Sequence, residues 1–190
     1  MDCRTIKPIE TEYKGYLFRS RIEARWAVFF DAMHIVWEYE KEGFDLGADV
    51  GRYLPDFWLP DQQYWIEIKG AEPTELEEKR CEELAHQTGY ITFVLFGNIP
   101  EKFQAEQNGS QSGYVHFVEG WDCFYQWTIC PICHKREMQF EGRYDRVSCS
   151  CDKTFNPEWD YKAVQKYTRG FHMLDDAYRK ARRERFSRLD

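Results

Sequence analysis

The chain of 190 residues is long enough for one sizeable hydrophobic core with a small satellite. Hydrophobic residues make up 43% and aromatic residues 17%, which excludes an intrinsically disordered chain, and the apolar runs are too short to span a bilayer. The formal net charge of −7 argues weakly against a polyanionic partner, although local charge decides binding more than the total does. The N-terminal sequence MDCRTIKPIE lacks the apolar stretch of a signal peptide, so we expect a cytoplasmic protein and no membrane partner.

Helix and strand signals alternate from the start of the chain to about Gly97. Ser20 is suited to cap a helix, with Glu23 three residues later as in a capping box. Apolar residues then recur at helical spacing: Ile22, Trp26, Phe29 and Met33. The following segments are expected to form three strands, a polar helix closed by Gly89, and a buried strand, over residues 36–40, 53–59 (interrupted by Pro55), 64–69, 74–87 and 91–96. The predicted order is therefore helix, three strands, helix, strand, an α/β arrangement.

Strand periodicity brings charged side chains together in segment 64–69. Alternate residues of a strand point to opposite faces, so Glu67 and Lys69 share one face with Trp65. If this strand pairs with the preceding one through the turn at 60–63, Asp56 comes beside Glu67. Two buried carboxylates repel each other, and a divalent cation relieves that repulsion.

Hard oxygen ligands of this kind suit Mg²⁺ or Mn²⁺, and the chemistry that fits them is hydrolysis of phosphodiester bonds. Lys69 would orient the attacking water or neutralise developing charge, and Glu23 on the first helix could reach the same pocket. The alternatives are that Glu67 and Lys69 form a solvent-facing ion pair, and that Glu23 serves only as a capping residue.

Four of the seven cysteines crowd into residues 130–151, which in a reducing compartment indicates a metal site more than disulfides. Cys130 and Cys133 form a C-x2-C pair, Cys149 and Cys151 form a C-x-C pair, and the segment between the pairs looks like a hairpin. Together the two pairs resemble a zinc ribbon, in which four thiolates hold one structural Zn²⁺. The second pair is tighter than usual, which leaves His134 as an alternative ligand. Reduced, buried cysteines without metal are the other interpretation.

Basic residues gather early in the chain and near its end, and we expect several to bind nucleic acid: Arg19, Arg21, Arg179, Arg182, Arg183 and Arg185. Clustered arginines suit contacts with phosphates, which position a nucleic acid without reading its sequence. Near the C-terminus, Phe171, Leu174, Tyr178 and Ala181 fall at helical spacing. The alternative there is a solvated helix end whose cations complement the helix dipole.

Glu23, the pair Pro55-Asp56 and the run Glu67-Ile68-Lys69 resemble the motif of the PD-(D/E)XK nuclease superfamily, in its form with an added acidic residue on the first helix. The segments FRSRIEARWAVFF, YLPDFWLP and WIEIKG are similar to those of phage- and transposon-associated members, including small junction-resolving endonucleases. The resemblance covers about residues 12–97 and implies a restriction-endonuclease-like αβββαβ core. It also implies that Asp56, Glu67 and the main-chain carbonyl of Ile68 hold the catalytic metal, with Glu23 and Lys69 completing the catalytic set.

These observations predict a nuclease core over 1–122, a zinc-ribbon module over 123–157 and a basic C-terminal helix over 158–190. We expect a Mg²⁺- or Mn²⁺-dependent endonuclease that hydrolyses DNA in the processing, recombination or repair of phage or mobile-element DNA, with no small-molecule cofactor. A homodimer would favour a resolvase, because two strands must then be cut in step. The alternative function is a catalytically inert adaptor that binds nucleic acid or protein through the zinc ribbon and the basic tail.

Overall fold

The structure, a computed structural model of the chain, describes residues 7–100, 114–116, 125–129, 134–140 and 172–187. This described part is a mixed α/β fold, as predicted, with three helices: α1 (Arg21–Ala32), α2 (Glu75–Thr88) and α4 (His172–Arg183). Each of these helices is too short or too polar to cross a membrane.

The central sheet has the strand order β3-β6-β7-β8-β9, with the bounds Glu38–Tyr39, Phe57–Leu59, Tyr64–Lys69, Ile91–Phe96 and Tyr114–His116. β7 and β8 are parallel, because α2 crosses over between them, and the other neighbours are antiparallel. Among these elements, the order is helix, three strands, helix, strand up to β8, as the sequence predicts. The bounds of β7 and β8 are those predicted, and α2 ends at Gly89, which adopts the left-handed conformation with φ 72°.

Two small hairpins were not predicted. β1 (Thr11–Tyr13) pairs with β2 (Tyr16–Phe18) ahead of α1, and β4 (Phe44–Asp45) pairs with β5 (Arg52–Tyr53). Strands of two or three residues are too short for a side-chain alternation to show in the sequence. The predicted strand over 53–59 is consequently divided around Pro55, with Tyr53 in β5 and Phe57–Leu59 in β6.

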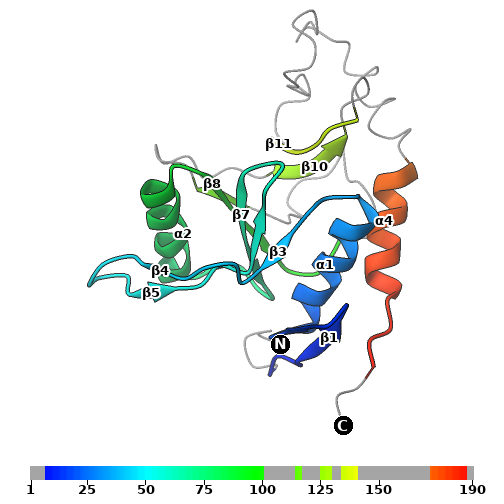
Figure 1. Cartoon of the computed structure of the whole chain (residues 1–190), viewed down its shortest axis with the longest axis horizontal. Helices are drawn as coiled ribbons and strands as arrows, with labels where there is room; N and C mark the ends of the chain where they lie inside the picture. Colours follow the sequence, from blue (N-terminus) through cyan, green and yellow to red (C-terminus); the bar gives the residue numbers. More distant parts are fainter. Residues whose placement is uncertain (1–6, 101–113, 117–124, 130–133, 141–171, 188–190) are drawn as a thin grey trace, which may run out of the picture.

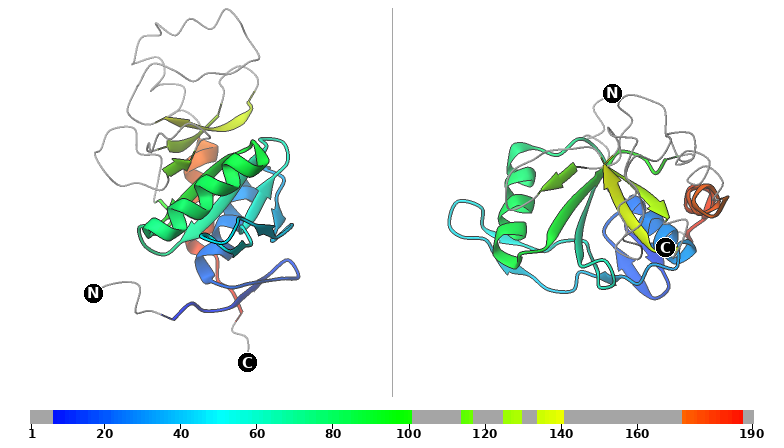
Figure 2. Two further views of the ribbon diagram at one scale, coloured as in Figure 1. Left: turned by 90° about the vertical axis from the view of Figure 1, so that its left-hand side faces the viewer. Right: turned by 90° about the horizontal axis from the view of Figure 1, so that it is seen from above.

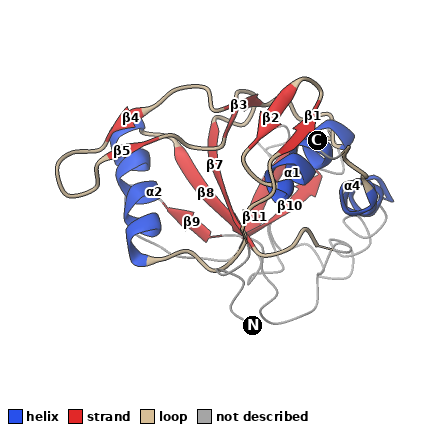
Figure 3. Ribbon diagram, turned by 90° about the horizontal axis from the view of Figure 1, so that it is seen from below, coloured by secondary structure: helices blue, strands red, loops and turns tan. Residues whose placement is uncertain are grey.

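The sheet lies between α2 on one face and α1 with α4 on the other (Figures 1 and 3). Ile66 and Ile68 of β7 belong to the hydrophobic cluster that contains α1 and α4. Trp65, from the alternate set, packs in a second cluster with Leu84 of α2. The predicted alternation along β7 is therefore confirmed. Glu67 is two residues from Trp65 on the strand, so its side chain lies on the same face, toward α2.

α4 packs along α1 in the antiparallel sense. The ring of Tyr178 stacks on that of Phe29, with centroids 4.6 Å apart. Arg182, one turn further along α4, lies near Arg25, one turn earlier on α1. The predicted apolar side of the last helix is confirmed within the described residues: Leu174, Tyr178 and Ala181 are buried.

β10 (Tyr125–Ile129) and β11 (Arg136–Phe140) form an antiparallel hairpin on either side of the C-x2-C positions in the sequence. Figure 2 shows this hairpin near the N-terminal end of α4. Trp127 is buried against Phe29 and Phe30 of α1. The hairpin thus shares a hydrophobic core with α1.

Because Trp127 belongs to this shared core, its substitution tests whether β10 folds together with α1. Trp127→Ala should lower the free energy of unfolding by about 3–5 kcal/mol, because it removes a buried indole from the seam between α1 and β10. Urea denaturation followed by fluorescence and circular dichroism would measure the change. Trp127→Phe, which keeps most of the buried ring, should cost less; equal stability of wild type and Trp127→Ala would show that β10 folds apart from α1.

Candidate active site

Asp56 lies between Pro55 and the first residue of β6, the strand that pairs with β7. Phe57 is paired with Ile66, so continuing the register by one residue places Asp56 opposite Glu67. Asp56 is 2% exposed. Its Oδ2 accepts a hydrogen bond of 2.7 Å from the backbone N–H of Ile68, and its Oδ1 lies 2.6 Å from Nη2 of Arg19.

The surroundings of Asp56 favour its protonated form. Burial, followed by the negative charges of Glu67 and Glu23, raises the pKa of Asp56 well above its usual range. The Ile68 N–H and the Arg19 guanidinium act in the opposite direction but do not offset these effects. Asp56 is therefore a buried carboxyl group that will hold a proton or another cation.

Glu67 and Lys69 lie beside each other on β7, as the strand alternation predicts. Glu67 is 4% exposed, and its Oε1 lies 2.6 Å from Nζ of Lys69. Lys69 also contacts Glu77 of α2, at 3.2 Å. Burial alone would lower the pKa of Lys69, but the charge and hydrogen bond of Glu67, with Asp56 and Glu77, raise it above its usual value. Lys69 is thus held firmly as an ammonium, and the interpretation of Glu67 and Lys69 as a solvent-facing pair is wrong.

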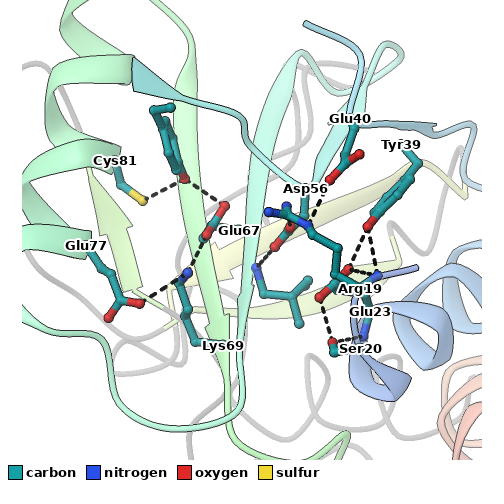
Figure 4. Close-up of polar contacts among 12 residues, drawn as sticks. Arg19, Ser20, Glu23, Tyr39, Glu40, Asp56, Glu67, Lys69, Glu77 and Cys81 are labelled. Atoms are coloured by element: carbon teal, nitrogen blue, oxygen red, sulfur yellow. Dashed lines mark hydrogen bonds and ion pairs between the residues drawn. The ribbon is translucent and has the colours of Figure 1, made fainter. Parts of the chain in front are cut away.

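Tyr53 completes the contacts of Glu67, and the sequence did not single it out. The Tyr53 hydroxyl donates a hydrogen bond of 2.7 Å to Oε2 of Glu67 and lies 3.5 Å from Sγ of Cys81. Burial, together with the charges of Cys81 and Glu67, raises the pKa of Tyr53, so the hydroxyl keeps its proton and remains a donor. Glu67 is fixed between this donor and Lys69 (Figure 4).

Glu23 of α1 combines capping with a place near the site. The Ser20 Oγ accepts from the backbone N–H of Glu23 at 3.3 Å, as in the first half of a capping box. The Glu23 carboxylate accepts from the Ser20 hydroxyl at 2.6 Å, from the Tyr39 hydroxyl at 2.8 Å and from the Arg19 backbone N–H at 3.1 Å. Glu23 is 6% exposed, and its charge is one of those that act on Asp56.

Arg19 joins the two halves of the site. Its backbone contacts Glu23, and its guanidinium bridges Asp56 and Glu40, with Nε 2.8 Å from the Glu40 carboxylate (Figure 4). The Arg19 side chain is 55% exposed, so it extends from the buried carboxylate of Asp56 to the protein surface. The sequence placed Arg19 among residues for nucleic acid but not beside Asp56.

The expected ligand set for Mg²⁺ or Mn²⁺ can be tested against these contacts. Asp56, Glu67 and the Ile68 carbonyl offer hard oxygen atoms, which suit these ions, and Figure 4 shows more carboxylates than cations. Within the ranges that the structure describes, no group of three or more His, Cys, Asp or Glu side chains is arranged to hold a metal. Two side chains and one carbonyl are compatible with Mg²⁺, because this ion keeps several of its waters. The residues therefore fit such an ion, provided that Arg19 gives up Asp56.

The remaining candidate residues lie apart from this cluster. Arg21 and Arg182 lie on α1 and α4, and Arg179 pairs with Asp176 on its own helix at 2.5 Å. Arg183 and Arg185 are exposed. The four cysteines proposed to bind zinc, Cys130, Cys133, Cys149 and Cys151, lie outside the described residues, and the zinc site stays a prediction. His134, the alternative ligand, is exposed.

The raised pKa of Asp56 predicts a dependence of stability on pH. A carboxyl group whose pKa is higher in the folded state stabilises the protein fully below its unfolded pKa and loses that contribution as the pH rises through the folded value. In EDTA, the melting temperature of wild type relative to Asp56→Asn should therefore fall as the pH rises over the range above about 4, the ordinary pKa of an aspartate. Differential scanning calorimetry of both proteins would measure it, and a constant difference across this range would contradict the environment described for Asp56.

No protein-family profile, curated protein or solved structure matches this chain.

Proposed function

We propose that this chain is a Mg²⁺- or Mn²⁺-dependent endonuclease that hydrolyses phosphodiester bonds in DNA. The observation that carries the proposal is that Asp56 and Glu67 are both buried and close enough to influence each other, with Lys69 paired to Glu67. The residues and their order along the chain are those that the resemblance to PD-(D/E)XK nucleases implies for catalysis.

The energetic setting supports a catalytic role more than a structural one. Burying carboxylates side by side is unfavourable, and apolar residues of similar size commonly stabilise a fold at least as well as a buried ion pair does. Here Asp56 is paired with Arg19 and Glu67 with Lys69, yet burial and the charges of Glu67 and Glu23 still raise the pKa of Asp56 well above its usual range. Strongly shifted pKa values in one cluster are typical of functional sites.

The roles of the side chains follow from their contacts. Asp56, Glu67 and the carbonyl of Ile68 would hold the metal, which supplies a water of lowered pKa and stabilises charge on the phosphoryl group. Lys69, held as an ammonium, donates hydrogen bonds to a water or a phosphate oxygen and does not act as a base. Tyr53 orients Glu67, and Glu23 keeps Arg19 and Tyr39 in place at the rim.

Cleavage assays test the proposal directly. Purified protein with Mg²⁺ or Mn²⁺ should cleave at least one of four substrates: supercoiled, linear duplex, single-stranded or branched DNA. Asp56→Asn, Glu67→Gln and Lys69→Met should each lower the rate by about 100-fold or more, because each removes a group that stabilises the transition state.

Matched controls come from the exposed side of α2, where Glu75→Gln and Lys79→Met change the same kinds of charge away from the site. These two variants should cleave as wild type does. Activity that survives Asp56→Asn would show a contaminating nuclease. Absence of cleavage of all four substrates would favour the inert adaptor instead.

Tyr53→Phe provides a separate prediction about positioning. Removing the hydroxyl leaves Oε2 of Glu67 without its donor, so the rate should fall by about 10-fold and the Mg²⁺ concentration for half-maximal rate should rise. Tyr13→Phe is the matched control, because the Tyr13 hydroxyl donates a similar bond to Asp31, away from the site. A Tyr53→Phe protein with unchanged Mg²⁺ dependence would show that Glu67 is positioned without Tyr53.

A further inference from the structure

Three arginines, two from α1 and one from α4, lie near one another where these helices pack together. Arg21 and Arg25 are one helical turn apart on α1, and Arg182 lies on α4. Because the two helices are antiparallel, with Tyr178 stacked on Phe29, the end of α4 lies beside the beginning of α1 (Figure 1). The Arg182 guanidinium is anchored there by a hydrogen bond of 2.8 Å to the carbonyl of Ile99.

The arrangement concentrates positive charge. Burial, followed by the charges of Arg21 and Arg182, lowers the pKa of Arg25 below its usual value. Among the described residues, the buried Nε of Arg25 has no hydrogen-bond partner. Arg25 is therefore repelled by two like charges, and a bound polyanion would relieve this repulsion.

A surface hollow of about 760 Å³ is lined by Arg19, which contacts Asp56, and by Arg21 of this cluster. It is also lined by Lys7, Pro8, Ile9, Glu10 and Ser187. Positive groups thus continue from the acidic site across the hollow to α4, with Glu10 as the acidic residue of its lining.

We infer that Arg21, Arg25 and Arg182 bind the phosphodiester backbone of a nucleic acid where it leaves the candidate active site through this hollow. The inference rests on the proposed nuclease function and names where that function's substrate lies. Guanidinium groups suit the occupant, because they bind phosphate oxygens with paired hydrogen bonds. The contact is with the backbone, so it would fix the position of the strand and not read its bases.

Lys79 provides the contrast. It is exposed on α2, which covers the face of the sheet opposite to α1 and α4. Its substitution removes one positive charge away from the proposed contact, so it should change binding little. Lys79→Gln is therefore the control for Arg25→Gln and Arg182→Gln.

The test is fluorescence anisotropy of labelled duplex and single-stranded DNA and RNA with the full chain in EDTA, over a series of salt concentrations. Arg21→Gln, Arg25→Gln and Arg182→Gln should each weaken binding about 3- to 10-fold and reduce the slope of log K against log salt by about 1. Lys79→Gln should bind as wild type does. Arg25→Lys, which keeps the charge, should retain most of the binding if Arg25→Gln proves unstable in a thermal melt.

The outcomes separate this inference from the nuclease proposal. If wild type cleaves DNA while the three variants bind it with wild-type affinity and slope, the inference is overturned and the nuclease stands. If the variants lose binding but wild type cleaves no substrate, the nuclease proposal fails and the backbone site stands. Polyglutamate serves as an acidic polypeptide probe. Tighter binding of polyglutamate than of nucleic acid, lost in the same variants, would assign the cluster to a protein partner and overturn the inference.

Discussion

The burial of the Asp56 carboxyl group is the constraint around which the described elements are arranged. An ionised carboxylate inside a protein is costly unless donors or cations surround it. The two groups that stabilise an ionised Asp56 come from separate parts of the chain: the Ile68 N–H from β7 and the guanidinium of Arg19 from the segment before α1. Glu23 of α1 acts against them, because its negative charge repels that of Asp56. β7 and the segment before α1 must therefore both be in place for Asp56 to be tolerated.

Much of the sheet and the centre of the site could be predicted, because their signals are local. β7 and β8 are long enough to show in the sequence, and Gly89 marks the end of α2. Alternation along β7 alone puts Glu67 beside Lys69, and pairing with β6 brings Asp56 opposite Glu67. Neighbours in a hairpin are also neighbours in sequence, so little about the tertiary structure had to be known.

The rest of the site depends on packing between distant segments. Tyr53 reaches Glu67 from β5, a strand of two residues that ends before Pro55, and strands so short leave no periodic signal. Arg25 acquires its significance from Arg182, more than a hundred and fifty residues later in the chain. The basic composition of these segments was visible from the sequence, whereas the distinction between Arg179, which is paired within its helix, and Arg25 was not.

Arg19 has a thermodynamic consequence for the way in which the site would fill. Its guanidinium binds Asp56, so a divalent ion at that carboxylate must compete with it, and a phosphate that draws the guanidinium away removes the competitor. Linkage requires this effect to be mutual, so each ligand would raise the affinity for the other by the same factor. Under the proposed function, substrate and metal would then bind cooperatively, and the protein without DNA would hold its metal only weakly.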